Sequence, residues 1–558
     1  MRKILTAKFL LIAIILLASI LRLYRLSVNP PSLFGDELDL GYQAYSILHT
    51  GRDYMGNFMP VHFHSLAEWR TPLYLYSAVP TVAIFGITPL GVRLPAAIFG
   101  TLIVYAMYLL VNQLTKNKNL SLVSAFLLAV SPWLIQYSRA GFEVTEMLFL
   151  LILGLYLFIK SLDTSKRLWL SVALLVLMPW VYSTAKLFTP LLLIFLFVLY
   201  RKKILRMAKR ELVFVLIAGL IIGVPIATST VFGGGTQRIN DISVFNDSKM
   251  EQTVGEGRKI DNNKFIYNKY TYWGSEILNN YFGSFSTDFL FLKGDANLRQ
   301  SIGTGELYLI EIVPLLLGLA FFFFEKNINT KTKLLMSFWL LVGAFPSALT
   351  IGGGTHATRL ILILPVLIFF ISFGWLSIYK IISQKYKTFF IVVASSLYIL
   401  SMVFYFHEYY LVYPINSEHW WHYGWGQAIS EVKSIDSSYD RVIISMSGEP
   451  AWIFFAGHYE YNPTIWQKEF PIGNDIEVSG FGKISHTGKF YFGSPDPNVK
   501  IYGLGKYIDS KTLYLANASE DGENLILHPD KTPEGLKLIK SIPFPSGEPA
   551  FYLFSGIK

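Results

Sequence analysis

The first polar segment of the sequence places an acidic pair, Asp36 and Glu37, shortly after the first apolar run. A carboxylate near a low-dielectric boundary has a raised proton affinity and can act as a general base, although a solvated turn is the simpler interpretation of such a pair. The same segment contains Arg70, Thr71 and Pro72 directly before a second apolar run. A guanidinium held by a proline-stiffened turn suits the binding of a phosphate at this boundary. Together these residues predict a base beside an anion site.

Two later polar segments carry charges that suit the same chemistry. Arg139 and Glu143 lie four residues apart, and they form either a site with a second acid or an ion pair at the start of the next helix. Lys186 is a lone cation between two apolar runs. It either extends its side chain to the aqueous interface or binds an anionic lipid headgroup. Both segments are therefore candidates for parts of the site.

A glycine-rich segment is a further candidate for phosphate binding. Three glycines, 352–354, come before His356 and Arg359, at the start of an apolar run. Exposed backbone N–H groups near the positive end of a helix dipole bind anions, so this segment is a candidate phosphate cradle. Asp295 and Arg299 belong to another segment, which either folds over the site or forms a simple turn.

The composition shows what must hold these residues. Of the 558 residues, 53% are hydrophobic and only 15% are charged, whereas an ordinary soluble domain is about a quarter charged. These values exclude disordered, coiled-coil and collagen-like chains. About 20 apolar residues cross a bilayer as a helix. We therefore predict a polytopic α-helical membrane protein with about 11 transmembrane helices, near residues 5–24, 90–113, 120–138, 145–160, 168–185, 187–200, 211–232, 305–324, 334–350, 360–382 and 388–408.

Basic residues fall in every second loop between these runs, and the densest group lies at 201–210. The positive-inside rule then predicts a cytoplasmic N-terminus, and it accounts for the net charge of +10 without nucleic acid as a partner. The first run lacks a cleavage site and is expected to remain as a span. The long segments at about 27–89 and 233–304 are expected outside the cytoplasm, the first with short helices lying at the interface. Cysteine is absent, which excludes disulfides, Fe–S clusters and a cysteine nucleophile.

The composition changes after the last apolar run. Residues 1–411 are predicted to form the transmembrane domain that carries the candidate site, and residues 412–558 a small extracytoplasmic α/β domain. Short alternating runs in this second region predict a helix and then four strands, at Gln427–Lys433, Arg441–Met446, Lys489–Phe492, Thr512–Leu515 and Ala550–Phe554.

The N-terminal pattern resembles a known family. Its elements are the acidic pair after the first span, Tyr42 and Ala44, Thr50-Gly51-Arg52-Asp53, the basic turn at Arg70, Phe85-Gly86 and Val92-Arg93-Leu94-Pro95. Together they resemble the GT-C glycosyltransferases, most of all the bacterial members of the protein O-mannosyltransferase and aminoarabinose-transferase superfamily. The resemblance covers residues 1–115 well and the rest in outline, and it implies a GT-C fold. Where the family has Lys-Pro-Pro, this chain has Arg70-Thr71-Pro72, which keeps the charge but not the first proline.

The resemblance implies roles for the candidate residues. Asp36 is expected to be the catalytic carboxylate with Glu37 beside it, and Glu143 the second acid of the family. The residues expected to bind the donor phosphate are Arg70, Lys186, His356 and Arg359. Further loop residues expected to contribute to the site are Arg139, Asp295 and Arg299.

The expected activity is inverting transfer of a sugar from a polyprenyl-phosphate-linked donor to an acceptor hydroxyl of a glycan, lipid or protein. Nucleotide-sugars are cytoplasmic, so a donor on the outer face of the plasma membrane must be carried by a lipid. A monophosphate leaving group surrounded by cations does not require a divalent ion, so no metal or other cofactor is expected, although the acids could still bind a metal, as in oligosaccharyltransferase members of the wider fold. Two alternatives stay open: an O-antigen ligase or polymerase, and a transporter or flippase for lipid-linked sugars.

Overall fold

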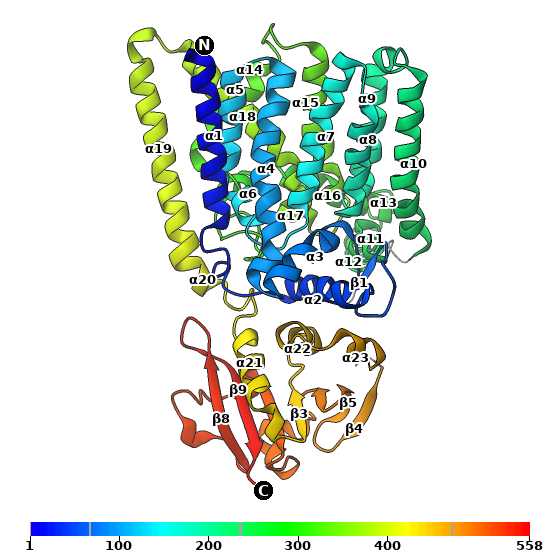
Figure 1. The fold of residues 1–558 in the computed structure, drawn as a ribbon, viewed down its shortest axis with the longest axis vertical. Coiled ribbons are helices and arrows are strands. Elements are labelled where there is room, and N and C mark those ends of the chain that lie inside the picture. The colour runs from blue at the N-terminus through cyan, green and yellow to red at the C-terminus, as the bar shows by residue number, and fades with distance from the viewer. Residues whose placement is uncertain (1, 66–67, 234–236, 470–472) are drawn as a thin grey trace.

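The computed structural model describes residues 2–65, 68–233, 237–469 and 473–558. They form a tall bundle of helices, a pair of helices lying across one end of the bundle, and a sheet with covering helices beyond that pair (Figure 1). The protein is a polytopic α-helical membrane protein with a C-terminal sheet region, as the sequence predicts. The division of the chain near residue 411 stays a prediction.

The helices of the bundle form from the predicted apolar runs, and every run contains at least one helix. They are α1 (Arg2–Leu23), α4 (Pro89–Thr115), α5 (Lys118–Val130), α6 (Pro132–Tyr137), α7 (Val144–Thr164), α8 (Leu168–Leu177), α9 (Ala185–Ile204), α10 (Lys209–Phe232), α14 (Ile312–Phe322), α15 (Thr330–Gly343), α16 (Phe345–Ala348), α17 (Ala357–Leu360), α18 (Leu364–Ile381) and α19 (Lys387–His407). Within the described residues, 6 continuous helical segments are long and apolar enough to cross a membrane. Length alone therefore does not confirm the predicted number of spans, because several runs are broken.

Prolines explain some of the breaks. The run predicted at 120–138 is divided at Ser131, which has an extended backbone before Pro132. Helix α8 likewise passes into the short 3-10 turn Met178–Trp180, which contains Pro179. Proline disfavours helical geometry at the residue before it and lacks a backbone donor, so one apolar run need not form one helix.

The segment between α1 and α4 builds the surface that carries the acidic pair. Its elements are α2 (Gly35–Thr50), the hairpin of β1 (Phe63–Ser65) and β2 (Glu68–Arg70), and α3 (Leu73–Phe85). Phe63 lies opposite Arg70 in the antiparallel hairpin. Helices α2 and α3 lie across the end of the bundle, next to the sheet region (Figure 1).

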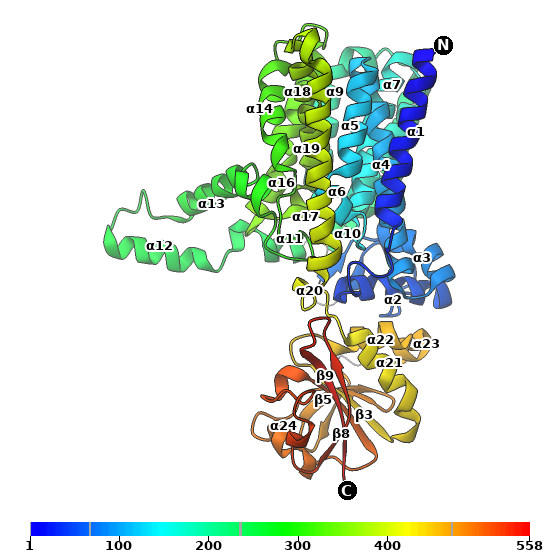
Figure 2. The same ribbon diagram turned by 90° about the vertical axis from the view of Figure 1, so that its left-hand side faces the viewer.

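The second long segment, between α10 and α14, has two parts. Its elements are α11 (Gln237–Ile242), α12 (Lys249–Ile260), α13 (Lys269–Gly283) and a π-helical turn (Asp288–Leu292). Helices α12 and α13 project sideways from the bundle (Figure 2). Helix α11 instead contacts β2, and Ser243 forms an isolated bridge with Thr350. This segment therefore reaches both the hairpin and the glycine-rich segment.

The C-terminal region contains a seven-stranded sheet with the order β4-β5-β6-β3-β7-β9-β8. Strand β3 is parallel to its neighbours β6 and β7, and the other pairs are antiparallel. The elements are α20 (Tyr413–Asn416), α21 (Trp425–Ile435), β3 (Arg441–Ile444), α22 (Ala451–Tyr459), α23 (Pro463–Lys468), β4 (Asp475–Val478), β5 (Gly482–Thr487), β6 (Phe490–Phe492), α24 (Lys500–Gly503), β7 (Thr512–Asn517), β8 (Leu536–Pro543) and β9 (Pro549–Gly556). The predicted helix and four strands correspond to α21, β3, β6, β7 and β9.

Helix α2 is packed between the bundle and the sheet region. On the outer side, Leu38 lies so close to Gly457 of α22 that a Cβ atom there would come within 2.8 Å of Leu38 Cδ2. The Tyr42 hydroxyl donates a hydrogen bond to the Tyr461 carbonyl oxygen at 3.0 Å. Apolar side chains of α2, α3 and α22 belong to one buried cluster. The position of α2 therefore depends on contacts with the C-terminal region.

Candidate active site

The acidic pair belongs to the first turn of α2, and its first member meets a cation. Asp36 Oδ1 lies 2.5 Å from Arg70 Nη2, and Arg70 Nη1 donates a hydrogen bond to the Asp36 carbonyl oxygen at 3.3 Å. The Asp36 side chain is 44% exposed and that of Arg70 12%. The structure thus brings together the two residues that the sequence singles out, with the carboxylate at the surface and most of the guanidinium covered.

A third carboxylate, absent from the sequence prediction, lies one helical turn after Asp36. Asp39 is buried, and the Ser65 hydroxyl donates a hydrogen bond to its Oδ2 at 2.6 Å. Burial raises the pKa of Asp39 to about 6, while the charge of Arg70 opposes the rise. Residues three apart share one side of a helix, so the spacing from Asp36 is the signal that points to Asp39. Carboxylates from two successive turns of α2 therefore lie near Arg70.

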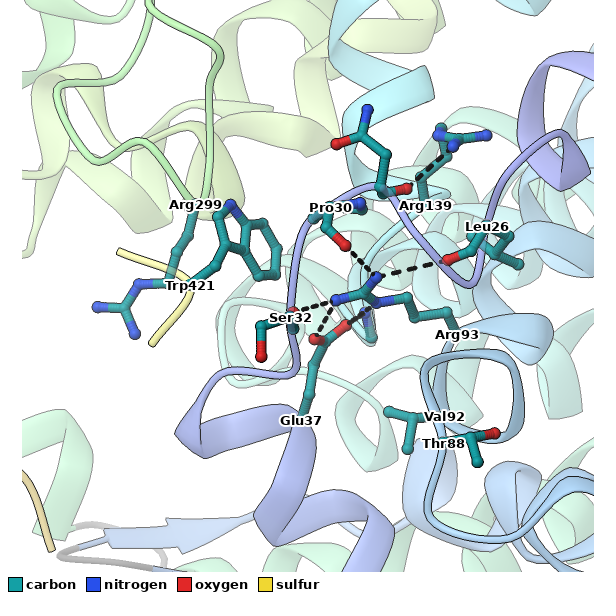
Figure 3. A network of polar contacts seen from close by, with 12 residues as sticks. Leu26, Pro30, Ser32, Glu37, Thr88, Val92, Arg93, Arg139, Arg299 and Trp421 are labelled. Carbon is teal, nitrogen blue, oxygen red and sulfur yellow. Dashed lines mark hydrogen bonds and ion pairs between the residues drawn. The ribbon is translucent and has the colours of Figure 1, made fainter. Parts of the chain in front are cut away.

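Glu37 points the other way and is fully buried. Its carboxylate accepts hydrogen bonds from Arg93 Nε at 2.7 Å and Arg93 Nη2 at 2.8 Å (Figure 3). Gly141 N–H donates to Glu37 Oε1 at 2.7 Å, and Arg93 also donates to the carbonyls of Pro30 and Ser32. Adjacent helical residues point about 100° apart, so one can be exposed and the next buried. Glu37 thus anchors α2 to α4, away from the exposed carboxylate of Asp36, and a catalytic role for it stays a prediction.

The two candidates in the loop before α7 have different surroundings. Arg139 is fully buried and donates to three carbonyls and one hydroxyl, those of Leu21, Arg22, Asn29 and Tyr409. It therefore joins the end of α1 to the segment after α19. Glu143 directly precedes α7 and is partly exposed. The bond from Gly141 to Glu37 holds this loop against α2, which keeps Glu143 a candidate acid.

A second group of polar residues surrounds the start of α9. Lys186 Nζ lies 3.3 Å from His62 Nε2, and His62 Nδ1 lies 2.6 Å from Ser229 Oγ. Burial, and then the charge of Lys186, lower the pKa of His62 to about 4, so the neutral ring accepts from the ammonium group and donates to the hydroxyl. His62 adjoins Phe63, which lies opposite Arg70 in the hairpin. His62, which the sequence analysis missed, thus contacts Lys186 from the residue next to the hairpin position that faces Arg70.

Lys186 lines two cavities of different character. One has a volume of about 600 Å³ and also contains Asn240 and Thr350 in its wall. The Thr350 hydroxyl accepts a hydrogen bond from Arg359 Nη1 at 2.7 Å. The other is an apolar groove of about 390 Å³ between α8, α9 and α10, with Leu193 in its wall. Lys186 therefore lies where the apolar groove of the bundle meets a larger cavity whose wall also carries polar side chains.

The glycine-rich segment is closed in the structure. Gly353 N–H donates a hydrogen bond to the Thr350 carbonyl oxygen at 3.0 Å, and Gly354 N–H donates to Asn280 Oδ1 at 3.2 Å. These two amides are used within the protein, which corrects the expectation of an open phosphate cradle. The glycines instead allow close packing, since a Cβ atom at Gly354 would lie 2.9 Å from the Asn280 backbone. Arg359 contacts the cavity wall indirectly, through its hydrogen bond to the Thr350 hydroxyl.

The segment before α14 contacts both the start of α2 and the residues around His356. Asp295 accepts a hydrogen bond from Ala357 N–H at 2.8 Å and lies 3.9 Å from His356 Nδ1. Burial raises the pKa of Asp295, against the hydrogen bonds that it accepts. The Arg299 guanidinium packs over the ring of Phe34, 5.0 Å from the ring centroid. Phe34 directly precedes α2. The segment is therefore more than a simple turn, because it packs against the start of α2 and orders the residues around His356.

Two residues of the C-terminal region also reach the start of α2. Gly35 N–H donates a hydrogen bond to His422 Nδ1 at 3.3 Å, and His422 Nε2 lies 2.9 Å from Glu449 Oε1. Gly35 and His422 are 387 positions apart in the sequence. No local pattern could therefore have pointed to this contact.

The arrangement suits proton transfer beside an anionic, partly apolar ligand. The half-exposed carboxylate of Asp36 can accept a proton, and the cations Arg70 and Lys186 can bind a phosphate. Among the residues that the structure describes, no group of three or more His, Cys, Asp or Glu side chains is placed to hold a metal ion.

Comparison with known proteins gives a family match over part of the chain and a similarity in fold. Residues 70–228 match the family described as dolichyl-phosphate-mannose-protein mannosyltransferase. No protein of curated function matches the sequence. The chain is similar in structure to the Archaeoglobus fulgidus oligosaccharyltransferase tethered with an acceptor peptide containing the NVT sequon, with a TM-score of 0.50 and 13% identity over 98% of this chain and 74% of that chain.

Two further structures are similar over large parts of the chain. The archaeal oligosaccharyltransferase AglB from Archaeoglobus fulgidus, in complex with an inhibitory peptide and a dolichol-phosphate, has a TM-score of 0.47 and 14% identity over 82% of this chain. The present chain spans only 64% of the length of that protein. ArnT from Cupriavidus metallidurans bound to undecaprenyl phosphate has a TM-score of 0.49 and 9% identity over 98% of this chain and 97% of that chain.

Proposed function

We propose that this chain is a GT-C-type membrane glycosyltransferase, similar to the protein O-mannosyltransferases and aminoarabinose transferases, and that it transfers a sugar from a polyprenyl-phosphate donor to an acceptor hydroxyl. The description of the matching family names dolichyl-phosphate mannose, which supports a donor of this chemistry. The observation that carries the proposal is the position of Lys186, in the wall of both the apolar groove and the larger cavity that contains polar side chains such as Asn240 and Thr350. A polyprenyl tail suits the groove, and a phosphate suits the cation.

In the proposed reaction, Asp36 accepts the proton of the acceptor hydroxyl while the hydroxyl oxygen attacks C1 of the sugar. The new C1–O bond forms as the bond from C1 to the phosphate oxygen breaks, and that electron pair stays on the phosphate. Attack opposite the leaving group inverts C1 in a single step. Arg70, Lys186 and Arg359 stabilise the charge on the departing polyprenyl phosphate while positive charge develops on the sugar ring.

The ion pair between Asp36 and Arg70 gives donor binding a second role. The two side chains are 2.5 Å apart, so the carboxylate is held by the cation that the donor phosphate would use. A phosphate that binds Arg70 competes for the same guanidinium and releases Asp36 for proton transfer. The base is thus set free only when the donor is in place.

Replacing Lys186 with methionine tests the donor site. The variant keeps the length of the side chain but loses its charge, so KM for polyprenyl-phosphate mannose should rise about tenfold or more, because a hydrogen bond to a charged group contributes about 1.5–3 kcal/mol. Initial rates at a series of donor concentrations give KM, with the protein in lipid nanodiscs and membranes of the native host as the acceptor source.

Two control variants accompany this measurement. Lys186→Arg keeps the charge and should stay close to the wild type. Lys385→Met removes an exposed lysine between α18 and α19 and should leave KM unchanged. A KM for Lys186→Met that equals the wild-type value would contradict the proposed donor site.

The proposal also requires the site to face away from the cytoplasm. Helix α9 begins beside the hairpin and ends with Arg201, Lys202 and Lys203 at the opposite end of the bundle, and such basic residues favour the cytoplasmic side. Because the chain lacks cysteine, single cysteines can report on each end. In intact cells, a membrane-impermeant maleimide should label Glu534→Cys, an exposed position before β8, and spare Lys202→Cys. The reverse pattern would place the site in the cytoplasm.

A further inference from the structure

The helix that carries Asp36 begins without a cap of its own. Phe34 occupies the N-cap position and forms no side-chain hydrogen bond there, although the first N–H groups of a helix need partners. A distant residue supplies one of these partners, because Gly35 N–H donates a hydrogen bond to His422 Nδ1 at 3.3 Å. Gly35 directly precedes Asp36 in the sequence.

The partners of His422 determine which of its nitrogens carries the proton. A backbone amide can only donate, so Nδ1 must accept and carries no proton. The proton then lies on Nε2, which is 2.9 Å from Glu449 Oε1. The carboxylate accepts this hydrogen bond and keeps the ring in the tautomer that can cap α2.

The backbone conformation of His422 and one ring contact hold the imidazole in position. His422 has a φ of +50°, in the left-handed region that residues other than glycine seldom adopt. Its ring packs edge-on against Phe454 of α22, with 5.0 Å between the centroids. Glu449 stands in the loop between β3 and α22. The contact therefore joins the segment after α20, the sheet region and the start of α2.

The charged groups around this pair belong to the candidate site. The hydrogen bond from His422 lowers the pKa of Glu449, with Arg299 acting in the same direction and burial and Asp36 in the opposite one. The side chain of His422 is 11% exposed and that of Glu449 42%. The pair thus lies at the edge of the candidate site, where the charges of Arg299 and Asp36 act on Glu449.

We propose that His422 and Glu449 are positioning residues that cap the first turn of α2 and thereby hold Asp36 in place for proton transfer. This inference rests on the proposed function of Asp36. Neither side chain needs to touch a substrate, since Glu449 orients the imidazole and the imidazole holds Gly35 N–H. Loss of the cap loosens the turn that carries the base, and small displacements of a catalytic group have large effects on rate. The docking of the C-terminal region thereby completes the site.

A pair of substitutions at one position tests the cap. His422→Leu removes the acceptor, and kcat should fall about tenfold with the donor KM within about twofold of the wild type. His422→Asn places Oδ1 close to the position of Nδ1, so it can still accept from Gly35 N–H and should keep kcat within about threefold of the wild type. Equal losses of kcat in the two variants would overturn the inference.

Hydrogen–deuterium exchange separates this inference from the proposed function. Exchange of the peptide that contains Gly35 should be faster in His422→Leu than in the wild type, and unchanged in His422→Asn. If the wild type uses no polyprenyl-phosphate sugar as a donor, the proposed function fails while this measurement still tests the cap. Equal exchange in all three proteins would overturn the inference.

Discussion

Replacing Asp36 with asparagine should reduce sugar transfer about 10³-fold at an unchanged level of folded protein, within the range that a general base contributes. Asparagine has nearly the same shape but cannot accept the proton of the acceptor hydroxyl. It also ends the ion pair that holds Arg70, so the donor phosphate gains an unopposed partner and the donor KM should not rise. Initial rates of labelled sugar transfer in nanodiscs, at equal amounts of folded protein, measure both quantities.

Asp39 offers a matched control on the same side of α2. Its carboxylate is buried and accepts a hydrogen bond from Ser65, so Asp39→Asn should cost less than about tenfold in rate, as expected for a group that only supports the site. If Asp39→Asn abolished transfer while Asp36→Asn retained it, the base would have to be reassigned to Asp39.

Breaking the buried pair of Glu37 and Arg93 should strongly destabilise the protein. Both side chains are fully buried, and removing one partner leaves an uncompensated charge at a cost of about 3–5 kcal/mol. Glu37→Gln and Arg93→Met should each lower the melting temperature and the yield of folded protein in detergent. Melting followed by size-exclusion chromatography measures both effects.

Three further variants distinguish this effect from simple loss of packing. The double variant Glu37→Gln/Arg93→Met leaves no buried charge and should recover part of the stability. Arg93→Lys should not rescue, because an ammonium group cannot reproduce the forked contacts of the guanidinium. Lys203→Met removes an exposed ion pair with Asp163 and should melt like the wild type. If Arg93→Met also melted like the wild type, the pair would not anchor α2.

The helices of the bundle are the part of the fold that the sequence predicts well. Apolar run length is a local property, so each predicted run contains a helix, and the misjudged stretches are those that prolines such as Pro132 divide. In the sheet region, the predicted strands are those with mostly buried residues, such as β7 and β9. Strand β4 was missed because only its last residue is buried, which leaves no alternating pattern to detect.

In the candidate site, too, the residues that belong to local sequence motifs could be predicted, and those positioned by distant contacts could not. Asp36 and Arg70 could be predicted because each lies in a short motif, and the hairpin brings the two together. The burial of Glu37 could not be predicted from the sequence, because its partner Arg93 belongs to another helix. His422 was missed for the same reason, since its contact with the start of α2 depends on the packing of the C-terminal region.

The stereochemistry and the leaving group of one turnover test the central claim most directly. The protein in nanodiscs receives polyprenyl-phosphate mannose of known anomeric configuration together with native membranes as acceptor. Nuclear magnetic resonance then reads the configuration of the transferred sugar, and mass spectrometry identifies the released lipid. We expect an inverted C1 and free polyprenyl phosphate from the wild type, and neither product from Asp36→Asn. A retained configuration, or undiminished release by Asp36→Asn, would contradict a single displacement assisted by this carboxylate.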